Sequence, residues 1–274
     1  AVISGASSTP ALSHAALDSL VEGWRQVNSI RVAISPGNRA PRGPSVVRAV
    51  LSYAGRPVRH FSAGRWRTAP GWSQSCRMAF PGIGPRRVSL CETPDLDLLV
   101  ERFRPKESAI FLAGLELGLL HRGLELTALP VRLGLLHSLL PFAHPLHKIA
   151  SLFERIGSDK GGMIVEAAGL DGEGEPVRAR WSLCAKAGRG PYVPTLPALA
   201  MIRHFRDGKI AYRGAKACTG FLTLTDLAGD FHRLGIVTQS TPFPAIASGS
   251  AGSETKTPVE PYRTRQRQAP CSRP

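Results

Sequence analysis

Apolar residues recur at helical spacing in several parts of the chain, and this spacing predicts its helices. Between residues 8 and 24 an apolar residue stands at every fourth position, namely Leu12, Ala16, Leu20 and Trp24. Such spacing indicates one face of an amphipathic helix. Shorter helices are predicted over residues 45–53, 93–103, 195–205 and 223–236.

Alternation of apolar and polar residues predicts the strands. Residues 30–35 alternate in this way, and residues 58–68 are typical of a β-hairpin. A longer hairpin is predicted over residues 161–186, with its turn at 171–174. In its second strand, residues 177–185, one face is expected in the core and the other against water or a cleft. Shorter strands are expected at residues 1–3, 77–80 and 86–92 and just before Cys218.

Residues 109–142 are unusually rich in Leu and predict two helices that are apolar around most of their circumference. Four charged residues interrupt the segment, Glu116, Arg122, Glu125 and Arg132, and Pro130 breaks it. No uncharged run reaches the length of about 18 residues that a membrane span requires. The helices are therefore expected to be buried, to pack at an oligomer interface, or to lie against a lipid surface.

The composition changes at residue 238. Residues 238–274 are rich in Ser, Thr, Pro and Gly and show no apolar period. Such a segment buries too little apolar surface to offset the entropy of ordering. We expect a disordered tail over residues 238–274.

The chain carries a net charge of +15, from 35 basic and 20 acidic residues. The basic residues are mostly Arg and are spread along the chain without a long run, and aromatic residues make up only 7%. A nucleic-acid interface usually concentrates its positive charge and adds stacking aromatics. We therefore expect no nucleic-acid partner and a diffusely basic surface.

The five cysteines are widely separated and form no Cys-x-x-Cys pair, so we expect neither a zinc site nor a disulfide framework. Reduced thiols fit a cytoplasmic location, with association at a membrane surface as the alternative. His137, His144 and His147 are near one another, but prolines disrupt the helix that would align them, and no metal site is expected.

Three groups of residues could contact a ligand. Ser7, Ser8 and Thr9 stand at a helix N-terminus that favours anions, with Thr9 able to cap the helix and His14 expected to be exposed. Arg39 and Arg42 could clamp a carboxylate, or could be solvated loop residues. Ser158-Asp159-Lys160 offers a base and an ammonium group, although a polar turn at the entry of the following strand is the favoured interpretation. Residues 81–85 contain two glycines but not the third glycine of a dinucleotide fingerprint.

Several segments, in order, resemble one family. They are SGASSTPALSHAALDSL, PGNRAPRG, VVRAVLSYAGRPVR, GRWRTAPGW, GGMIVEAAGLDGEGEPVRARWSL and TGFLTLTDL with LGI. Over residues 1–237 the chain is similar to the C-terminal part of saccharopine dehydrogenase-like oxidoreductases. The resemblance implies an α+β fold with a central mixed β-sheet and flanking helices. It makes residues 1–24 the remnant of a Rossmann domain and crossover helix, 25–108 and 157–237 the two parts of a substrate domain, and 109–156 a Leu-rich helical insertion.

The resemblance also implies a function. Residues at the crossover would line the nicotinamide end of NAD or NADP: Gly5, Ser7, Ser8, Thr9 and Pro10. An acidic small-molecule substrate would be held by Arg39, Arg42, Ser158, Asp159 and Lys160, in a homodimer. The resemblance implies that most of the nucleotide-binding half is absent from this chain. We therefore expect that the chain alone binds no cofactor and is not catalytically competent. The alternative is a membrane- or lipid-surface-associated protein that uses residues 109–142.

Overall fold

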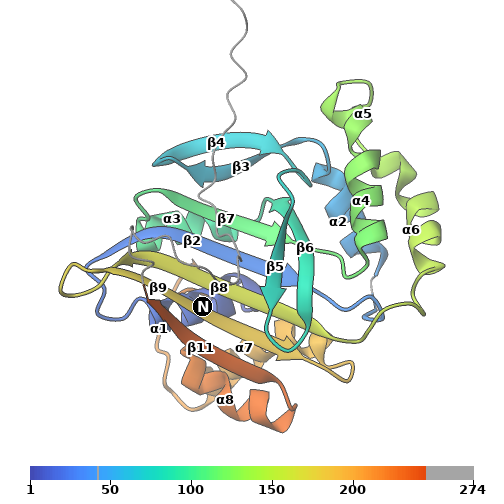
Figure 1. Cartoon of the computed structure of the whole chain (residues 1–274). Coiled ribbons are helices and arrows are strands. Elements are labelled where there is room, and N and C mark those ends of the chain that lie inside the picture. Colours follow the sequence, from blue (N-terminus) through green and yellow to red (C-terminus); the bar gives the residue numbers. More distant parts are fainter. Residues whose placement is uncertain (42, 245–274) are drawn as a thin grey trace, which may run out of the picture.

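A mixed β-sheet of nine strands forms the centre of the molecule (Figure 1), in a computed structural model that describes residues 1–41 and 43–244. The main strand order is β11-β9-β8-β2-β7-β3-β4, and β6 joins β5 to β7. Only β2 and β7 are parallel neighbours, and all other pairs in this sheet are antiparallel. The strands are β2 (Gln26–Ser35), β3 (Pro57–Ser62), β4 (Arg65–Pro70), β5 (Cys76–Phe80), β6 (Gly84–Cys91), β7 (Ser108–Ala113), β8 (Gly161–Leu170), β9 (Pro176–Ala185) and β11 (Val237–Pro244).

Helices cover one face of the sheet and the β5–β6 hairpin covers part of the other (Figure 1). The helices are α1 (Ser13–Leu20), α3 (Asp95–Phe103), α7 (Leu196–Arg206) and α8 (Leu224–Arg233). Trp181 and Leu183 of β9 lie in the core beneath these helices, as the alternation predicts. The opposite core contains Phe80 of the hairpin and Ile164 of β8. The prediction of an α+β fold with a central mixed sheet and flanking helices is confirmed.

The second face of β9 differs from the expected wet or cleft-lining surface. Ser182 and Cys184, which alternate with the core residues, are only 4% and 6% exposed. A Cβ atom placed on Gly82, in the turn between β5 and β6, would lie 3.1 Å from Sγ of Cys184. The hairpin turn therefore covers this end of β9, and sequence alternation alone could not reveal the cover.

The Leu-rich segment is only partly helical. Residues 109–113, predicted as helix, belong to strand β7, which lies between β2 on one side and β3 and β6 on the other. A continuous apolar run is typical of a strand with both faces buried, so its periodicity does not distinguish strand from helix. The helical part is α4 (Gly118–Thr127), α5 (Leu129–Arg132), η2 (Leu140–Phe142) and α6 (Ala143–Ser151), which lies beside α2 (Pro44–Tyr53) at one end of the sheet (Figure 1).

Strand β11 corrects the expectation that disorder begins at residue 238. It pairs with β9 along its whole length as the outermost strand of the sheet. An edge strand makes one set of ladder hydrogen bonds and can be rich in Ser and Thr, which explains why its composition resembles a tail. Residues 245–274 of the expected tail lie outside the described residues.

A second, two-stranded sheet stands apart from the main one. It consists of the parallel strands β1 (Val2–Ser4) and β10 (Ala215–Ala217), and none of their six residues is buried. Between β1 and α1 lies the helical turn η1 (Ser8–Leu12), which contacts the turn η3 (Gly190–Thr195) after β9. The chain thus runs from the small sheet directly into the helical layer beneath the main sheet.

Candidate functional site

A buried carboxylate joins three segments at one end of the main sheet. Glu116 follows β7, and its Oε2 atom accepts hydrogen bonds from the backbone N–H groups of Asn38, at 2.6 Å, and Ser158, at 2.9 Å. Its Oε1 atom accepts from the Ser158 hydroxyl at 2.7 Å and pairs with Nη1 of Arg86 at 2.9 Å. The side chains of Arg86 and Glu116 are 7% and 10% exposed.

The hydrogen bonds decide the charge state of Glu116. Burial would raise its pKa, but the donors from Asn38, Ser158 and Arg86 outweigh burial and hold the pKa below the ordinary value of 4.5. Glu116 is therefore ionised at neutral pH. Its charge is balanced by Arg86, so the network holds the loops in place without adding net charge.

This network brings two of the predicted ligand-contacting segments together. Arg39 donates its backbone N–H to the Ser158 carbonyl at 3.1 Å, and a Cβ atom on Gly37 would lie 2.7 Å from the same oxygen. The segment of residues 158–160 therefore packs directly on the loop that follows β2. The side chains of Arg39 and Lys160 are exposed there. Arg42 lies outside the described residues.

The hydroxyl of Ser158 is already engaged by Glu116, so it positions the loop. A third cation, Lys186, lies near Lys160 and was not among the residues predicted from the sequence. Lys186 follows β9, and both Lys186 and Lys160 oppose the effect of burial, which raises the pKa of the Cys184 thiol. The antiparallel register pairs Gly161 with Ala185, which places Lys160 and Lys186 next to each other in the two flanking positions. That register follows from the hairpin turn, so the sequence contained this signal.

The predicted cofactor segment forms a tight turn. Gly5 has a φ of +70°, and a Cβ atom there would lie 2.5 Å from Cδ of Pro10, so the position requires glycine. Ser7 donates its backbone N–H to the Gly5 carbonyl at 2.8 Å. Ser8 and Thr9 are half-buried and open the turn η1, but no side-chain hydrogen bond caps it, contrary to the expectation for Thr9. Because η1 contacts η3, this segment lies beside the chain that leaves β9.

His14 is fully buried, and the expectation of an exposed helical residue is wrong. Its Nε2 atom lies 3.0 Å from Oδ1 of Asp95, and the Ser13 hydroxyl donates to Oδ2 at 2.8 Å. His14 and Asp95 are 0% and 2% exposed. The group joins the start of α1 to the start of α3 inside the fold.

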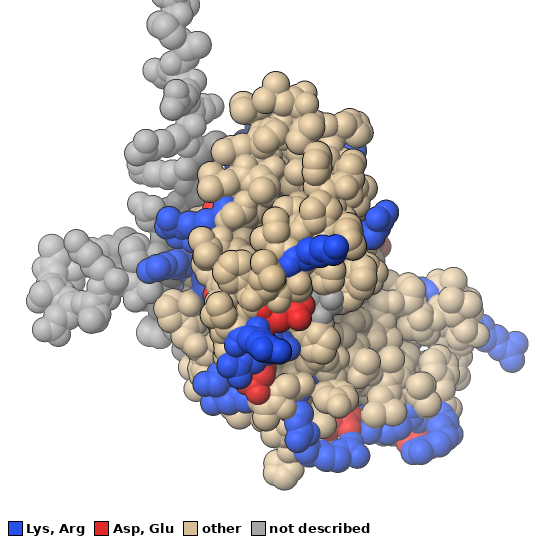
Figure 2. Space-filling view, turned by 90° about the vertical axis from the view of Figure 1, so that its right-hand side faces the viewer, with Lys and Arg blue, Asp and Glu red and all other residues tan. Residues whose placement is uncertain are grey.

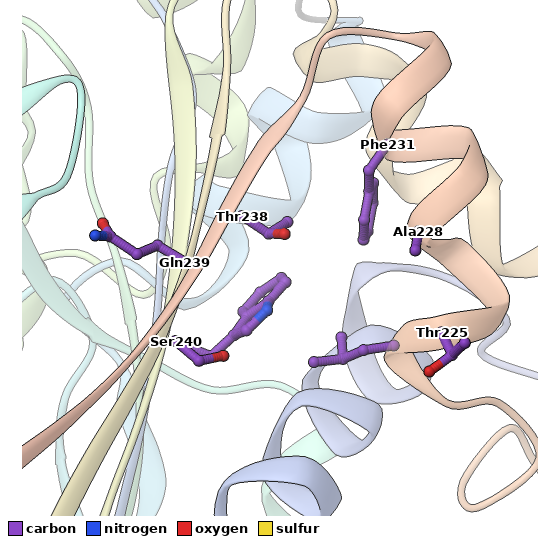
Figure 3. A pocket seen from close by; sticks show the side chains of 8 residues that line it. Thr225, Ala228, Phe231, Thr238, Gln239 and Ser240 are labelled. Atoms are coloured by element: carbon purple, nitrogen blue, oxygen red, sulfur yellow. The ribbon is translucent and has the colours of Figure 1, made fainter.

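A cavity of about 300 Å³ lies between α8 and the strands β9 and β11 (Figure 3). Phe231 and Ala228 point into it from α8, and Thr238 and Ser240 contribute hydroxyl groups from β11. Its remaining lining residues are Trp181, Leu224, Thr225 and Gln239. The lining residues include no ionisable side chain, so they supply no acid–base group.

No protein-family model matches the sequence, and no curated protein matches it. A solved structure does match: an apo histidine-tagged saccharopine dehydrogenase (L-Glu forming) from Saccharomyces cerevisiae. The match has a TM-score of 0.60 and 12% identity, and it covers 86% of this chain and 73% of that chain. The chain has the fold of a saccharopine dehydrogenase. At this identity the likeness shows the fold alone.

Within residues 1–41 and 43–244, no group of three or more His, Cys, Asp or Glu side chains is arranged to hold a metal ion. Within the same residues, no helix has the length and apolarity to cross a membrane.

Proposed function

We propose that this chain is the substrate-binding and dimerisation portion of a saccharopine dehydrogenase-like NAD(P)-dependent oxidoreductase. The fold supports the class, and the observation that carries the role is the Glu116 network. It holds Arg39 and Lys160 on adjoining loops, with Lys186 beside Lys160. Three exposed cations on a fixed backbone suit a small substrate with carboxylate groups. Ser158 and Asp159 would shape the loop that presents Lys160.

A nucleotide-binding unit would complete the site, and NAD or NADP would then meet Gly5, Ser7, Ser8, Thr9 and Pro10. The β1–β10 pair supports this arrangement. Parallel strands normally belong to larger sheets covered on both faces, whereas these two strands have no buried residue. The described residues contain no glycine-rich strand–turn–helix fingerprint. We therefore propose that this chain alone neither binds the cofactor nor turns over substrate.

Ligand-dependent thermal unfolding tests the substrate role. A dicarboxylic amino acid such as glutamate should raise Tm, because a ligand at 100 times its Kd stabilises the native state by about 2.7 kcal/mol. Lys160→Gln and Lys186→Gln should remove most of the shift. Arg65→Gln is the matched control, since Arg65 is an exposed cation on the edge strand β4. An equal shift in all variants would refute the site, and a shift with NADPH alone would refute the cofactor proposal.

A second candidate function rests on the exposed apolar residues of the helical insertion. Ten large apolar side chains of this segment are exposed: Leu119, Leu126, Leu129, Leu133, Leu135, Leu136, Phe142, Ile149, Leu152 and Ile156. Figure 2 shows this side of the molecule, with uncharged side chains over its upper part and Lys and Arg at its borders. An apolar surface bordered by cations matches an anionic membrane surface. In the dehydrogenase proposal the same surface forms the contact between two copies.

Cosedimentation with anionic liposomes separates these two uses. Leu119→Glu with Leu135→Glu replaces two side chains that are 69% and 74% exposed, and it should abolish vesicle binding if the insertion contacts lipid. Ile202→Glu, at a residue that is 64% exposed on α7, is the matched control. Sedimentation velocity of the same variants reports on dimerisation. Vesicle binding that survives the double substitution would rule out the membrane candidate.

A further inference from the structure

A second cavity, of about 360 Å³, lies where the β5–β6 hairpin meets the helical insertion. Its lining residues come from three elements: Arg87 from β6, Arg122, Glu125 and Leu126 from α4, and Leu129 and Arg132 from α5. Three guanidinium groups and one carboxylate thus share a single hollow. This cavity is distinct from the Glu116 network and from the cavity beneath α8.

The three arginines of this cavity lack the ion pairs that some other arginines of the described residues form. Eight others form ion pairs with carboxylates: Arg31, Arg59, Arg86, Arg102, Arg180, Arg203, Arg206 and Arg233. Over residues 1–41 and 43–244, neither Arg87, Arg122 nor Arg132 has a carboxylate oxygen within 4.0 Å. Guanidinium groups that converge without a carboxylate partner provide the forked donors that bind oxyanions.

Two of these arginines donate hydrogen bonds to groups other than a carboxylate. Arg87 uses Nη1 for the Ser75 hydroxyl at 2.9 Å. Arg132 uses Nη2 for the Trp72 carbonyl, and its buried Nε has no hydrogen-bond partner within the described part of the chain. Burial lowers the pKa of Arg132, and the charge of Glu125 offsets this effect only in part. Arg122 is exposed at the rim.

Glu125 does not cancel the positive charge of the cavity, because its carboxylate also accepts a hydrogen bond from a residue outside the cavity lining. Its Oε1 accepts the Ser89 hydroxyl at 3.0 Å, and Ser89 in turn lies 2.7 Å from Nε2 of the buried His121. The backbone N–H of Leu115 donates to Nδ1 of His121, so the proton of the neutral ring resides on Nε2. The buried histidine adds no charge. Three positive charges and one negative charge leave a net charge of +2 around the hollow.

We propose that this cavity binds a phosphate monoester. A phosphate monoester carries a charge between −1.5 and −2 at neutral pH and presents three acceptor oxygens, which match a net charge of +2 and three arginines. A carboxylate has one charge and two oxygens and matches the cavity less well. Leu126 and Leu129 form an apolar wall for the group esterified to the phosphate. The ester can come from a soluble metabolite or from a lipid headgroup, and the chemistry recognised is the same.

Calorimetric titration of the whole chain with glycerol 3-phosphate tests the proposal. We expect one site, an affinity that falls as salt rises, and a loss of about 10-fold or more in Arg122→Gln, because a charge-assisted hydrogen bond is removed. Arg155→Gln is the matched control, since Arg155 is an exposed cation of the same insertion and does not line the cavity. Glu125→Gln should tighten binding about 3-fold or more, because it removes a like charge while retaining an acceptor for Ser89.

The opposite signs of the two substitutions separate a binding site from general destabilisation, which could only weaken binding. Vesicles of phosphatidylcholine with and without phosphatidic acid identify the source of the ester. Competition by phosphatidic acid vesicles would support a lipid headgroup, whereas binding of glycerol 3-phosphate without competition would support a soluble ester. The proposal is overturned if neither probe binds at up to about 10 mM phosphate ester. It is equally overturned if Arg122→Gln and Arg155→Gln have the same affinity.

Discussion

Substituting Glu116 by Gln tests whether the buried carboxylate holds the candidate substrate loops. The substitution keeps the size of the side chain but removes its charge and places an amide donor among four existing donors. Those donors are the backbone N–H groups of Asn38 and Ser158, the Ser158 hydroxyl and the Arg86 guanidinium. Arg86, only 7% exposed, would be left without its carboxylate.

The expected cost follows from the burial of this pair. Removing one partner of a buried ion pair costs about 3–5 kcal/mol, because the remaining charge stays desolvated. We expect Glu116→Gln to lower the free energy of unfolding by about 3 kcal/mol, since Gln still accepts one hydrogen bond. Urea denaturation at neutral pH should report a midpoint lower by about 1 M. Glu173→Gln, at an exposed residue of the β8–β9 turn, should leave the midpoint unchanged.

The pH dependence gives the same test a second readout. The pKa of Glu116 is below 4.5 in the folded chain, so its stabilisation is fully present above the unfolded pKa. It is lost as the pH falls through the folded pKa, and the difference between wild type and Glu116→Gln should therefore shrink below about pH 4. A cost under about 1 kcal/mol at neutral pH would show that the network does not hold the loops.

Three other predictions use different parts of the molecule. Gly5→Ala should destabilise the fold by about 2 kcal/mol, because Gly5 has a positive φ and an added Cβ would meet Pro10. Gly229→Ala in α8 should stabilise the fold by about 1 kcal/mol, because an added Cβ meets nothing within 4 Å. Equal Tm values for the two variants would contradict both predictions. Burial, aided by Arg87, lowers the pKa of His121 to about 4, so NMR titration should find it neutral at pH 6. Because unfolding raises that pKa, stability should fall by about 3 kcal/mol from pH 6.5 to pH 4. Asp230→Asn removes the carboxylate shared by an arginine from α7 and an arginine from α8, so it should lower Tm. Asp207→Asn, at an exposed ion pair, should leave Tm unchanged.

Part of the candidate site could be predicted from the sequence, because local order determines it. The turn at residues 171–174 and the alternation that follows it set the register of β8 and β9, and this register places Lys160 beside Lys186. The glycine at position 5 is required by a local turn. Predictions of this kind depend on neighbours that are close in the chain.

The remaining parts depend on residues that are far apart in the chain. Glu116 reaches Asn38, 78 positions away, and Ser158, 42 positions away, so no local pattern identifies it as the residue that joins the loops. The burial of His14 depends on Asp95, which belongs to another helix. The cavity of three arginines exists only because β6, α4 and α5 meet.

The sequence by itself determined most of the helices and the hairpins at residues 58–68 and 161–186, because the period of apolar residues specifies which face of each element is buried. Only the tertiary structure decided that residues 109–113 form a central strand and that residues 238–244 form an edge strand. An unbroken apolar run has no period, and an edge strand needs no apolar face of its own. Both assignments are therefore made by the strands that lie alongside.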